Sequence, residues 1–289
     1  MTKSIAVVLG LVAVVAISGP AMAFLPVQNG LVSHLRAGAG TGIGPPIVVN
    51  WLDQSGNNND LTQDVANGFG APMRVAGVLN GRTVVRFGTG GEGVIGDALV
   101  NPDGNELPPD ADWTLFIVMR STGYYAPLST AQAPQEPVGN RAFRFNPHGG
   151  GHKIAIGYVG SGEPPLGPID SNWHVDVVVH DDDTTSFKTG RDSPTLNDSS
   201  LAATYEQAAL ALGRFNFGGT PGWASFEGDI AEVIIFNREL NPTEIDMIGG
   251  YLANVRYNLP SDFQWVPEPA TMALLGIGGL LVLGRRRAA

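Results

Sequence analysis

Short apolar runs separated by glycine and proline restrict the fold of this chain more than any other feature. The sequence has 39 glycines and 21 prolines among 289 residues, and between residues 24 and 269 its apolar runs stay short. Such punctuation is typical of strands joined by turns. Nine strands are predicted, at residues 31–36, 83–87, 113–120, 142–146, 153–159, 173–180, 184–189, 209–215 and 230–236. The pattern predicts an all-β fold built from two packed sheets.

Two of these strands are predicted to be central. Residues 113–119 and 175–179 are apolar almost throughout. Such runs are typical of strands covered on both faces or of a sandwich interior. Trp51 and Trp113 lie in strand-like runs and are therefore predicted to belong to the core.

One short amphipathic helix is predicted near the end of the β-rich region. Asn241 can act as its N-cap, Pro242 suits its first turn, and Glu244 completes a capping box. Helical spacing predicts one apolar face made of Ile245, Ile248, Leu252 and Val255. This face should lie against the sandwich.

The absence of cysteine excludes a disulfide framework, a thiolate metal site and a cysteine nucleophile. Residues 24–269, which exclude Lys3 and the three terminal arginines, contain 13 basic and 27 acidic residues. Their net charge is −14. Such a surface repels nucleic acid and anionic lipid, suits cations, and keeps a protein soluble. Nucleic acid is therefore not expected as a partner.

The first 23 residues have the pattern of a secretory signal peptide. Lys3 precedes an apolar run at residues 5–17, and Ala21-Met22-Ala23 forms a cleavage site. Cleavage there would leave Phe24 as the first residue of the mature chain. A retained N-terminal helix is the alternative.

The C-terminal segment, residues 263–289, has three parts. Pro267-Glu268-Pro269 lies in the motif 266–269, an uncharged apolar helix is expected at 270–284, and Arg285, Arg286 and Arg287 open the basic end 285–289. A helix of 15 residues spans roughly 22 Å, short of a hydrocarbon core of about 30 Å, so it is a marginal anchor. The arginines should stay on the cytoplasmic side. The rest of the chain then lies outside the cytoplasm.

This arrangement resembles the PEP-CTERM sorting signal of Gram-negative envelope proteins. The resemblance implies transient anchoring in the inner membrane, cleavage by an exosortase-type sorting protease, and transfer to the cell surface or extracellular matrix. A membrane tail that is never cut is the alternative.

Three further segments, 51–60, 79–87 and 228–240, resemble landmarks of LamG-like, concanavalin A-like jelly-roll domains. The resemblance spans roughly residues 29–258 and places one such domain at residues 24–262. It implies a rigid two-sheet scaffold whose loops or concave face bind carbohydrate or protein, often with a structural calcium ion.

The best cation candidate is the oxygen-rich loop from Asp53 to Asp60, since hard Ca²⁺ prefers oxygen ligands. The resemblance suggests a calcium site that uses Asp53 and Asp229, with Asn57 as a further candidate ligand. A plain Asx turn without an ion is the favoured alternative, because Asp, Asn and Gly form turns unaided.

Glu227, Asp229 and Glu232 have a spacing that resembles the catalytic strand of laminarinase-type β-glucanases. Retaining hydrolysis needs two carboxyl groups about 5 Å apart, which a bulged strand could supply. However, Gly228 replaces an apolar residue of that motif, and the segment opens the last strand before the helix. A protein without catalytic activity is therefore expected, with a secreted glycoside hydrolase using Glu227 and Glu232 as the alternative.

Three aromatic residues beside Gly/Pro loops, Tyr124, Tyr125 and Trp223, are candidates for a carbohydrate-binding platform, because sugar rings stack on exposed aromatic faces. Together these features predict an exported, envelope-sorted, non-catalytic module that binds extracellular polysaccharide or another surface component. A passive structural matrix protein is a further alternative.

Overall fold

The computed structural model confirms the all-β fold. It describes residues 25–41, 46–88, 91–92, 95–101, 106–108, 111–122, 127–131, 143–147, 152–156, 172–181, 184–189, 196–198, 209–217 and 220–259. The predicted signal peptide, the sorting segment, Tyr124 and Tyr125 lie outside these residues, and the division of the chain into residues 1–23, 24–262 and 263–289 stays a prediction. Within the described residues, none of the helices is long and apolar enough to cross a bilayer.

The larger sheet is antiparallel and has β18 near its centre. Its strand order is β14-β13-β12-β8-β18-β5-β4, and β1 also pairs with β18. The strands are β1 (Leu31–Arg36), β4 (Met73–Leu79), β5 (Arg82–Phe87), β8 (Trp113–Ser121), β12 (His174–Asp181), β13 (Thr184–Thr189), β14 (Leu196–Asp198) and β18 (Gly228–Phe236).

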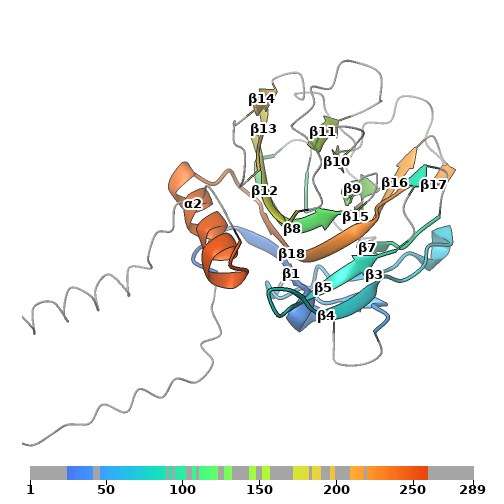
Figure 1. Cartoon of the computed structure of the whole chain (residues 1–289). Helices are drawn as coiled ribbons and strands as arrows, with labels where there is room; N and C mark the ends of the chain where they lie inside the picture. The colour runs from blue at the N-terminus through green and yellow to red at the C-terminus, as the bar shows by residue number, and fades with distance from the viewer. Residues whose placement is uncertain are drawn as a thin grey trace, which may run out of the picture.

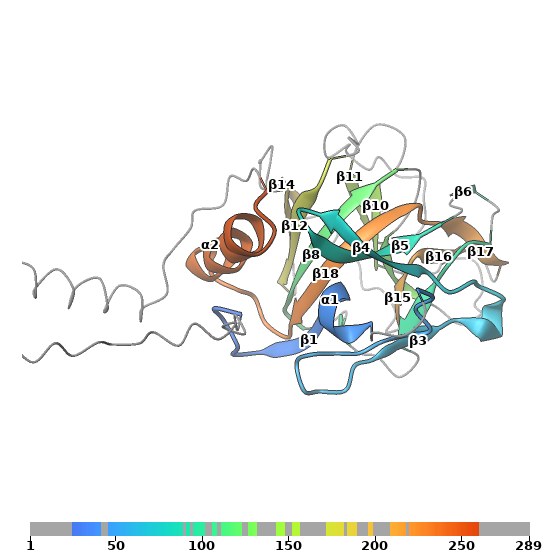
Figure 2. The same ribbon diagram turned by 60° about the horizontal axis from the view of Figure 1, so that its bottom comes forward.

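The second sheet faces one side of the first, with the order β11-β10-β9-β15-β7-β3-β2. Its strands are β2 (Asn50–Trp51), β3 (Leu61–Gln63), β7 (Leu99–Asn101), β9 (Leu128–Ala131), β10 (Phe143–Pro147), β11 (His152–Ile156) and β15 (Ala209–Leu212). A small third sheet consists of β6 (Gly91–Glu92), β16 (Arg214–Phe217) and β17 (Thr220–Ser225). Figure 2 shows it at the end of the molecule away from helix α2.

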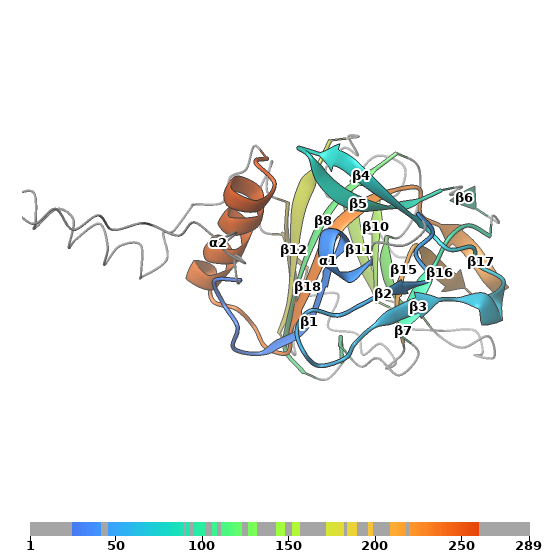
Figure 3. The same ribbon diagram turned by 90° about the horizontal axis from the view of Figure 1, so that it is seen from below.

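Helix α2 (Pro242–Gly250) continues into a π-helix at Tyr251–Arg256, and together they cover the other face of the larger sheet. Figure 1 and Figure 3 show α2 on one side of this sheet and the second sheet on the other. Two short helical turns, α1 (Ala37–Gly40) and the 3₁₀ turn Val65–Asn67, lie in connections.

The layering explains the apolar runs, because both faces of the central strands are covered. On β8, Leu115 and Ile117 lie in the core between the sheets, whereas Phe116 and Val118 lie in the core that includes α2. Trp51 and Trp113 are both fully buried, as predicted.

Strand β18 changes its neighbour halfway along. It pairs with β8 over most of its length, but on its other side it pairs with β5 at residues 228–230 and with β1 at residues 232–236. The register shifts between Ile230 and Glu232, which marks a bulge. The two halves of β18 therefore have different surroundings.

The predicted helix start is confirmed, but its predicted face is wrong at one position. The Asn241 side chain accepts from the Glu244 backbone N–H, and the Glu244 carboxylate accepts from the Asn241 backbone N–H. Ile248 and Leu252 are buried, yet Val255 is 50% exposed. A π-helix winds more residues into each turn than an α-helix, so the 3.6-residue period ends at Tyr251.

The strand predicted at 209–215 is in fact two strands. Gly213 separates β15 from β16, and its φ of +87° is in the left-handed region. A Cβ there would lie 2.4 Å from the Asp97 carbonyl oxygen and from the Phe87 ring. The chain can turn at this point only because the residue is glycine.

Candidate functional site

The carboxylate of Asp229 lies between two arginines from the strands that flank β18. In the register of the sheet, Asp229 is opposite Arg86 of β5 and Arg120 of β8. Arg86 donates from Nε to Oδ1 at 2.7 Å and from Nη2 to Oδ2 at 3.1 Å. Arg120 donates from Nε to Oδ2 at 2.8 Å, and its Nη2 lies 2.7 Å from the same oxygen. One buried carboxylate thus holds two guanidinium groups.

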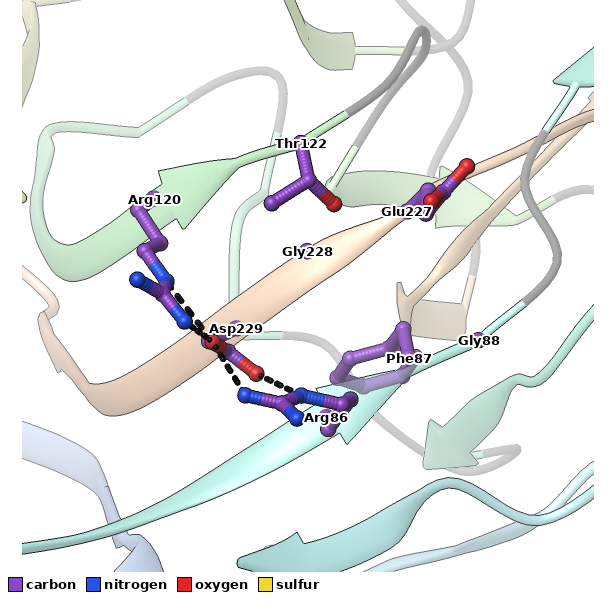
Figure 4. Close-up of a pocket in the computed structure, with 8 residues that line it drawn as sticks. All are labelled: Arg86, Phe87, Gly88, Arg120, Thr122, Glu227, Gly228 and Asp229. Carbon is purple, nitrogen blue, oxygen red and sulfur yellow. Dashed lines mark hydrogen bonds and ion pairs between the residues drawn. The ribbon is translucent and has the colours of Figure 1, made fainter. Parts of the chain in front are cut away.

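These three residues line a pocket of about 390 Å³. The other lining residues are Phe87, Gly88, Thr122, Glu227 and Gly228 (Figure 4). The hydrogen bond to Asp229 raises the pKa of Arg86 above its ordinary value. The Arg120 guanidinium carbon also lies 5.3 Å from the ring centre of Trp173, within cation–π distance. Both arginines are therefore held in place.

Close packing of the backbone forms the floor of this pocket at Gly228. A Cβ at this position would lie 2.3 Å from the Arg120 carbonyl oxygen and 2.5 Å from the Phe226 ring. Glycine is required here by the close approach of β8. Packing therefore explains why Gly228 stands where the glucanase motif has an apolar residue.

Glu227 and Asp229 both line the pocket, but Glu232 does not. Glu232 is 1% exposed and belongs to a separate network under the π-helix. Its Oε1 lies 2.6 Å from His34 Nε2, and its Oε2 accepts from the Tyr257 hydroxyl at 2.5 Å and lies 3.7 Å from Arg256 Nε. Burial and the neighbouring Glu232 raise the pKa of Tyr257 well above its ordinary value.

Glu227 is half-buried, and its side chain forms no hydrogen bond with any residue that the structure describes. Figure 4 shows its carboxylate directed away from that of Asp229. The proposed catalytic pair, Glu227 and Glu232, is therefore divided between an open pocket and a sealed network.

The loop at Asp53 is held by hydrogen bonds to that carboxylate. It accepts from the backbone N–H groups of His34, Ser55 and Asn59 and from the Ser55 hydroxyl. The Asn57 amide donates to the carbonyl oxygen of Val32. Donors, not other oxygen ligands, converge on Asp53, which does not fit a calcium cage and is the geometry of an Asx turn.

Asp229 belongs to a different network from Asp53 and Asn57. Its two oxygens face guanidinium groups, whose positive charges oppose a divalent cation. Among the described residues, no group of three or more His, Asp or Glu side chains is placed to hold a metal ion. The calcium site stays a prediction that metal addition would test.

Of the predicted aromatic platform, Tyr124 and Tyr125 lie outside the described residues, and Trp223 lies in β17 with a side chain that is not described. The sequence reasoning missed Arg86, Arg120 and Trp173. Each arginine directly follows a mostly apolar run near the end of its strand, Thr83-Val84-Val85 before Arg86 and Ile117-Val118-Met119 before Arg120. A charge after such a run was the available signal, but it does not show which charges meet.

Residues 266–288 match the PEP-CTERM protein-sorting motif, which confirms the predicted sorting signal and implies export and sorting to the cell surface. The motif also implies processing by exosortase-type sorting machinery. Curated protein sequences give no match.

The fold is similar to solved structures of carbohydrate-active enzymes. A GH54 α-L-arabinofuranosidase matches with a TM-score of 0.53 and 14% identity, over 80% of this chain and 60% of that one. An arabinofuranosidase complexed with arabinofuranosyl-α-1,2-xylobiose matches with a TM-score of 0.51 and 16% identity, over 79% and 60%. A Trypanosoma rangeli sialidase matches with a TM-score of 0.52 and 14% identity, over 80% and 34%.

These matches define the class as a β-sandwich of the jelly-roll kind that carries a surface-sorting motif. The chain spans less than two thirds of each of these enzymes, and identities of 14% to 16% show the shared fold alone. The expectation that the protein has no catalytic activity is nevertheless contradicted, because the three solved structures with this fold named above are enzymes, two arabinofuranosidases and a sialidase. The fold gives no ground for excluding an enzyme.

Proposed function

We propose that this is an exported, surface-sorted protein that binds extracellular polysaccharide in the pocket at the Asp229 end of β18. The observation that carries the proposal is the fixed set of polar groups in that pocket, two arginines locked on one carboxylate beside a half-buried Glu227. Concave sites with a few convergent polar groups are typical ligand sites. The sorting motif supports an extracellular ligand, and the fold supports a glycan.

Sorting follows from the C-terminal segment. Pro267, Glu268 and Pro269 would be read by an exosortase-type protease while the apolar segment is held transiently in the inner membrane, with the arginines on the cytoplasmic side. Substitution of Pro267 and Pro269 by alanine should leave the protein in the membrane fraction. Unchanged delivery to the surface would contradict this route.

Binding is tested with the full chain, purified in mild detergent, against a panel of soluble polysaccharides by affinity electrophoresis. Arg86→Gln should weaken retention by the polysaccharide that binds. Arg82→Gln is the matched control, because this substitution removes the same charge from the same strand. Arg82 is exposed and does not line the pocket. Equal loss in both variants, or no binding by the wild type, would contradict the proposal.

Catalysis is the second candidate, favoured by Glu227 as a half-buried carboxylate within the pocket. The same polysaccharides are assayed for release of reducing ends. Release that is abolished in Glu227→Gln would assign hydrolysis to this pocket. Retention without release would assign binding.

A further inference from the structure

In the pocket at Asp229, the two arginines are accessible, whereas the carboxylate that they share is not. The Arg86 and Arg120 side chains are 43% and 28% exposed, whereas the Asp229 side chain is 2% exposed. A ligand that enters on this side meets guanidinium groups before it meets the carboxylate.

Both guanidinium groups keep hydrogen-bond donors free. Each has five N–H donors and no acceptor. The contacts with Asp229 use Nε and Nη2 of both arginines, and Nη1 of neither arginine hydrogen-bonds to any described residue. The open part of the cluster therefore offers donors and calls for a ligand group that only accepts.

The net charge of the cluster formed by Arg86, Arg120 and Asp229 also favours a ligand group that accepts hydrogen bonds. Two arginines and one aspartate leave one positive charge in excess, and Glu227 is directed away from them (Figure 4). The full chain has a net charge of −10, so this excess is local and is not part of a general basic surface. Local charge of this kind favours one anionic group at a defined place.

The arginines are also held in advance of binding. Asp229 fixes both guanidinium groups, and the Trp173 ring lies against Arg120. Groups held in their bound geometry lose less entropy when a ligand arrives.

We propose that Arg86 and Arg120 bind the carboxylate of an acidic sugar, a uronic acid unit of an extracellular polysaccharide. The planar fork of a guanidinium matches the two oxygens of a carboxylate. This proposal rests on the proposed glycan-binding function and specifies its ligand.

The test uses two forms of one ligand, trigalacturonate and its methyl ester, with the full chain in mild detergent and titration calorimetry as the readout. The wild type should bind trigalacturonate at least about tenfold more tightly than the ester, since a hydrogen bond to a charged group contributes about 1.5–3 kcal/mol. Arg86→Gln should remove most of this preference, and Arg82→Gln should preserve it.

Other outcomes separate the two proposals. Equal binding of acid and ester would overturn the carboxylate assignment and leave the glycan function standing. Binding of neutral polysaccharides alone would do the same. Binding of no glycan at all would overturn both. Equal loss in Arg82→Gln and Arg86→Gln would show an effect of total charge and would overturn the assignment to the pocket.

A folding defect is controlled by Arg86→Lys, which keeps the charge and loses the fork. Its melting temperature should be close to that of the wild type, and its preference for the acid should fall at least about threefold, because a single ammonium cannot hold both oxygens. Full retention of the preference would overturn the bidentate geometry.

Discussion

The two halves of β18 hold the same kind of side chain in opposite settings. Asp229 and Glu232 are each 1% exposed and only three positions apart. The partners of Asp229 are guanidinium groups that open onto a pocket, whereas those of Glu232 are His34, Tyr257 and Arg256 beneath the π-helix. Burial of a carboxylate therefore does not decide its role. What decides it is whether its partners can reach a ligand.

The bulge between Ile230 and Glu232 and the change of neighbour from β5 to β1 produce this division. One half of the strand ends at the pocket, and the other half lies under the helix. Because the Glu232 half of β18 lies under the helix and away from the pocket, substitutions there should change stability without changing ligand preference. Substitutions at the Asp229 end should change both.

The largest effect is expected for Glu232→Ala. The change removes the carboxylate that accepts from the buried Tyr257 hydroxyl and the charge that faces Arg256. Loss of one partner from a buried charged network costs about 3–5 kcal/mol of unfolding free energy. Urea denaturation measures it. Glu239→Ala, at an exposed position, should stay within about 0.5 kcal/mol of the wild type.

A smaller loss is expected for Asp229→Asn, although the residue is as buried as Glu232. The two arginines would repel each other, but at 43% and 28% exposure they can turn towards water. We expect a loss of about 2 kcal/mol in urea denaturation. The loss should shrink at high salt because salt screens the repulsion. A loss as large as that of Glu232→Ala, unaffected by salt, would remove the distinction between the two ends.

Much of the fold could be predicted from the sequence because its signals are local. The capping box at Asn241 and Glu244 and the apolar runs of β8 and β12 each depend on neighbouring residues. Non-local contacts set the rest. Glycine is needed at residue 213 because the Asp97 carbonyl oxygen and the Phe87 ring, both remote in sequence, leave no room for a Cβ.

The site was harder to predict for the same reason. The spacing of Glu227, Asp229 and Glu232 was visible, but the bulge that separates them was not. Arg86 and Arg120 meet Asp229 only through the strand order β8-β18-β5. A sequence shows which groups can act chemically, and the sheet register decides which of them meet.

A loss of about 1 kcal/mol is expected for Asn241→Ala, because the helix that covers the Glu232 end would lose its N-cap. Thermal denaturation of the variant measures it. Asn241→Ser keeps an accepting oxygen and should retain nearly all of the stability. Loss of ligand preference in Asn241→Ala would show that the two ends of β18 are coupled.

The smallest effect is expected for Glu106, a buried carboxylate that forms no ion pair with any residue that the structure describes. Its Oε1 accepts from the Asn101 amide at 2.7 Å, and its Oε2 has no hydrogen-bond partner among the described residues. Burial raises the pKa of Glu106, and Asp53 adds to the rise, whereas the bond from Asn101 opposes it. Asp229 and Glu232 differ in that charged or hydrogen-bonding partners satisfy both of their oxygens.

A raised pKa in the folded state has a definite sign for stability. Between the unfolded and folded pKa values of Glu106, the folded protein holds a proton that the unfolded chain has lost, so stability falls as pH rises through this window. Glu106→Gln cannot ionise and can still accept from Asn101. It should be more stable than the wild type at pH 7, by less than the loss expected for Asn241→Ala, and the difference should shrink as the pH falls towards the ordinary pKa of a glutamate, about 4.3. Urea denaturation at both pH values measures it.

A difference that stays constant would show that packing, and not charge, sets the effect at Glu106. A Glu106→Gln variant that is less stable than the wild type at pH 7 would indicate a cation at the Glu106 carboxylate. The charge of Glu106 would then be compensated by a positive group, as that of Asp229 is.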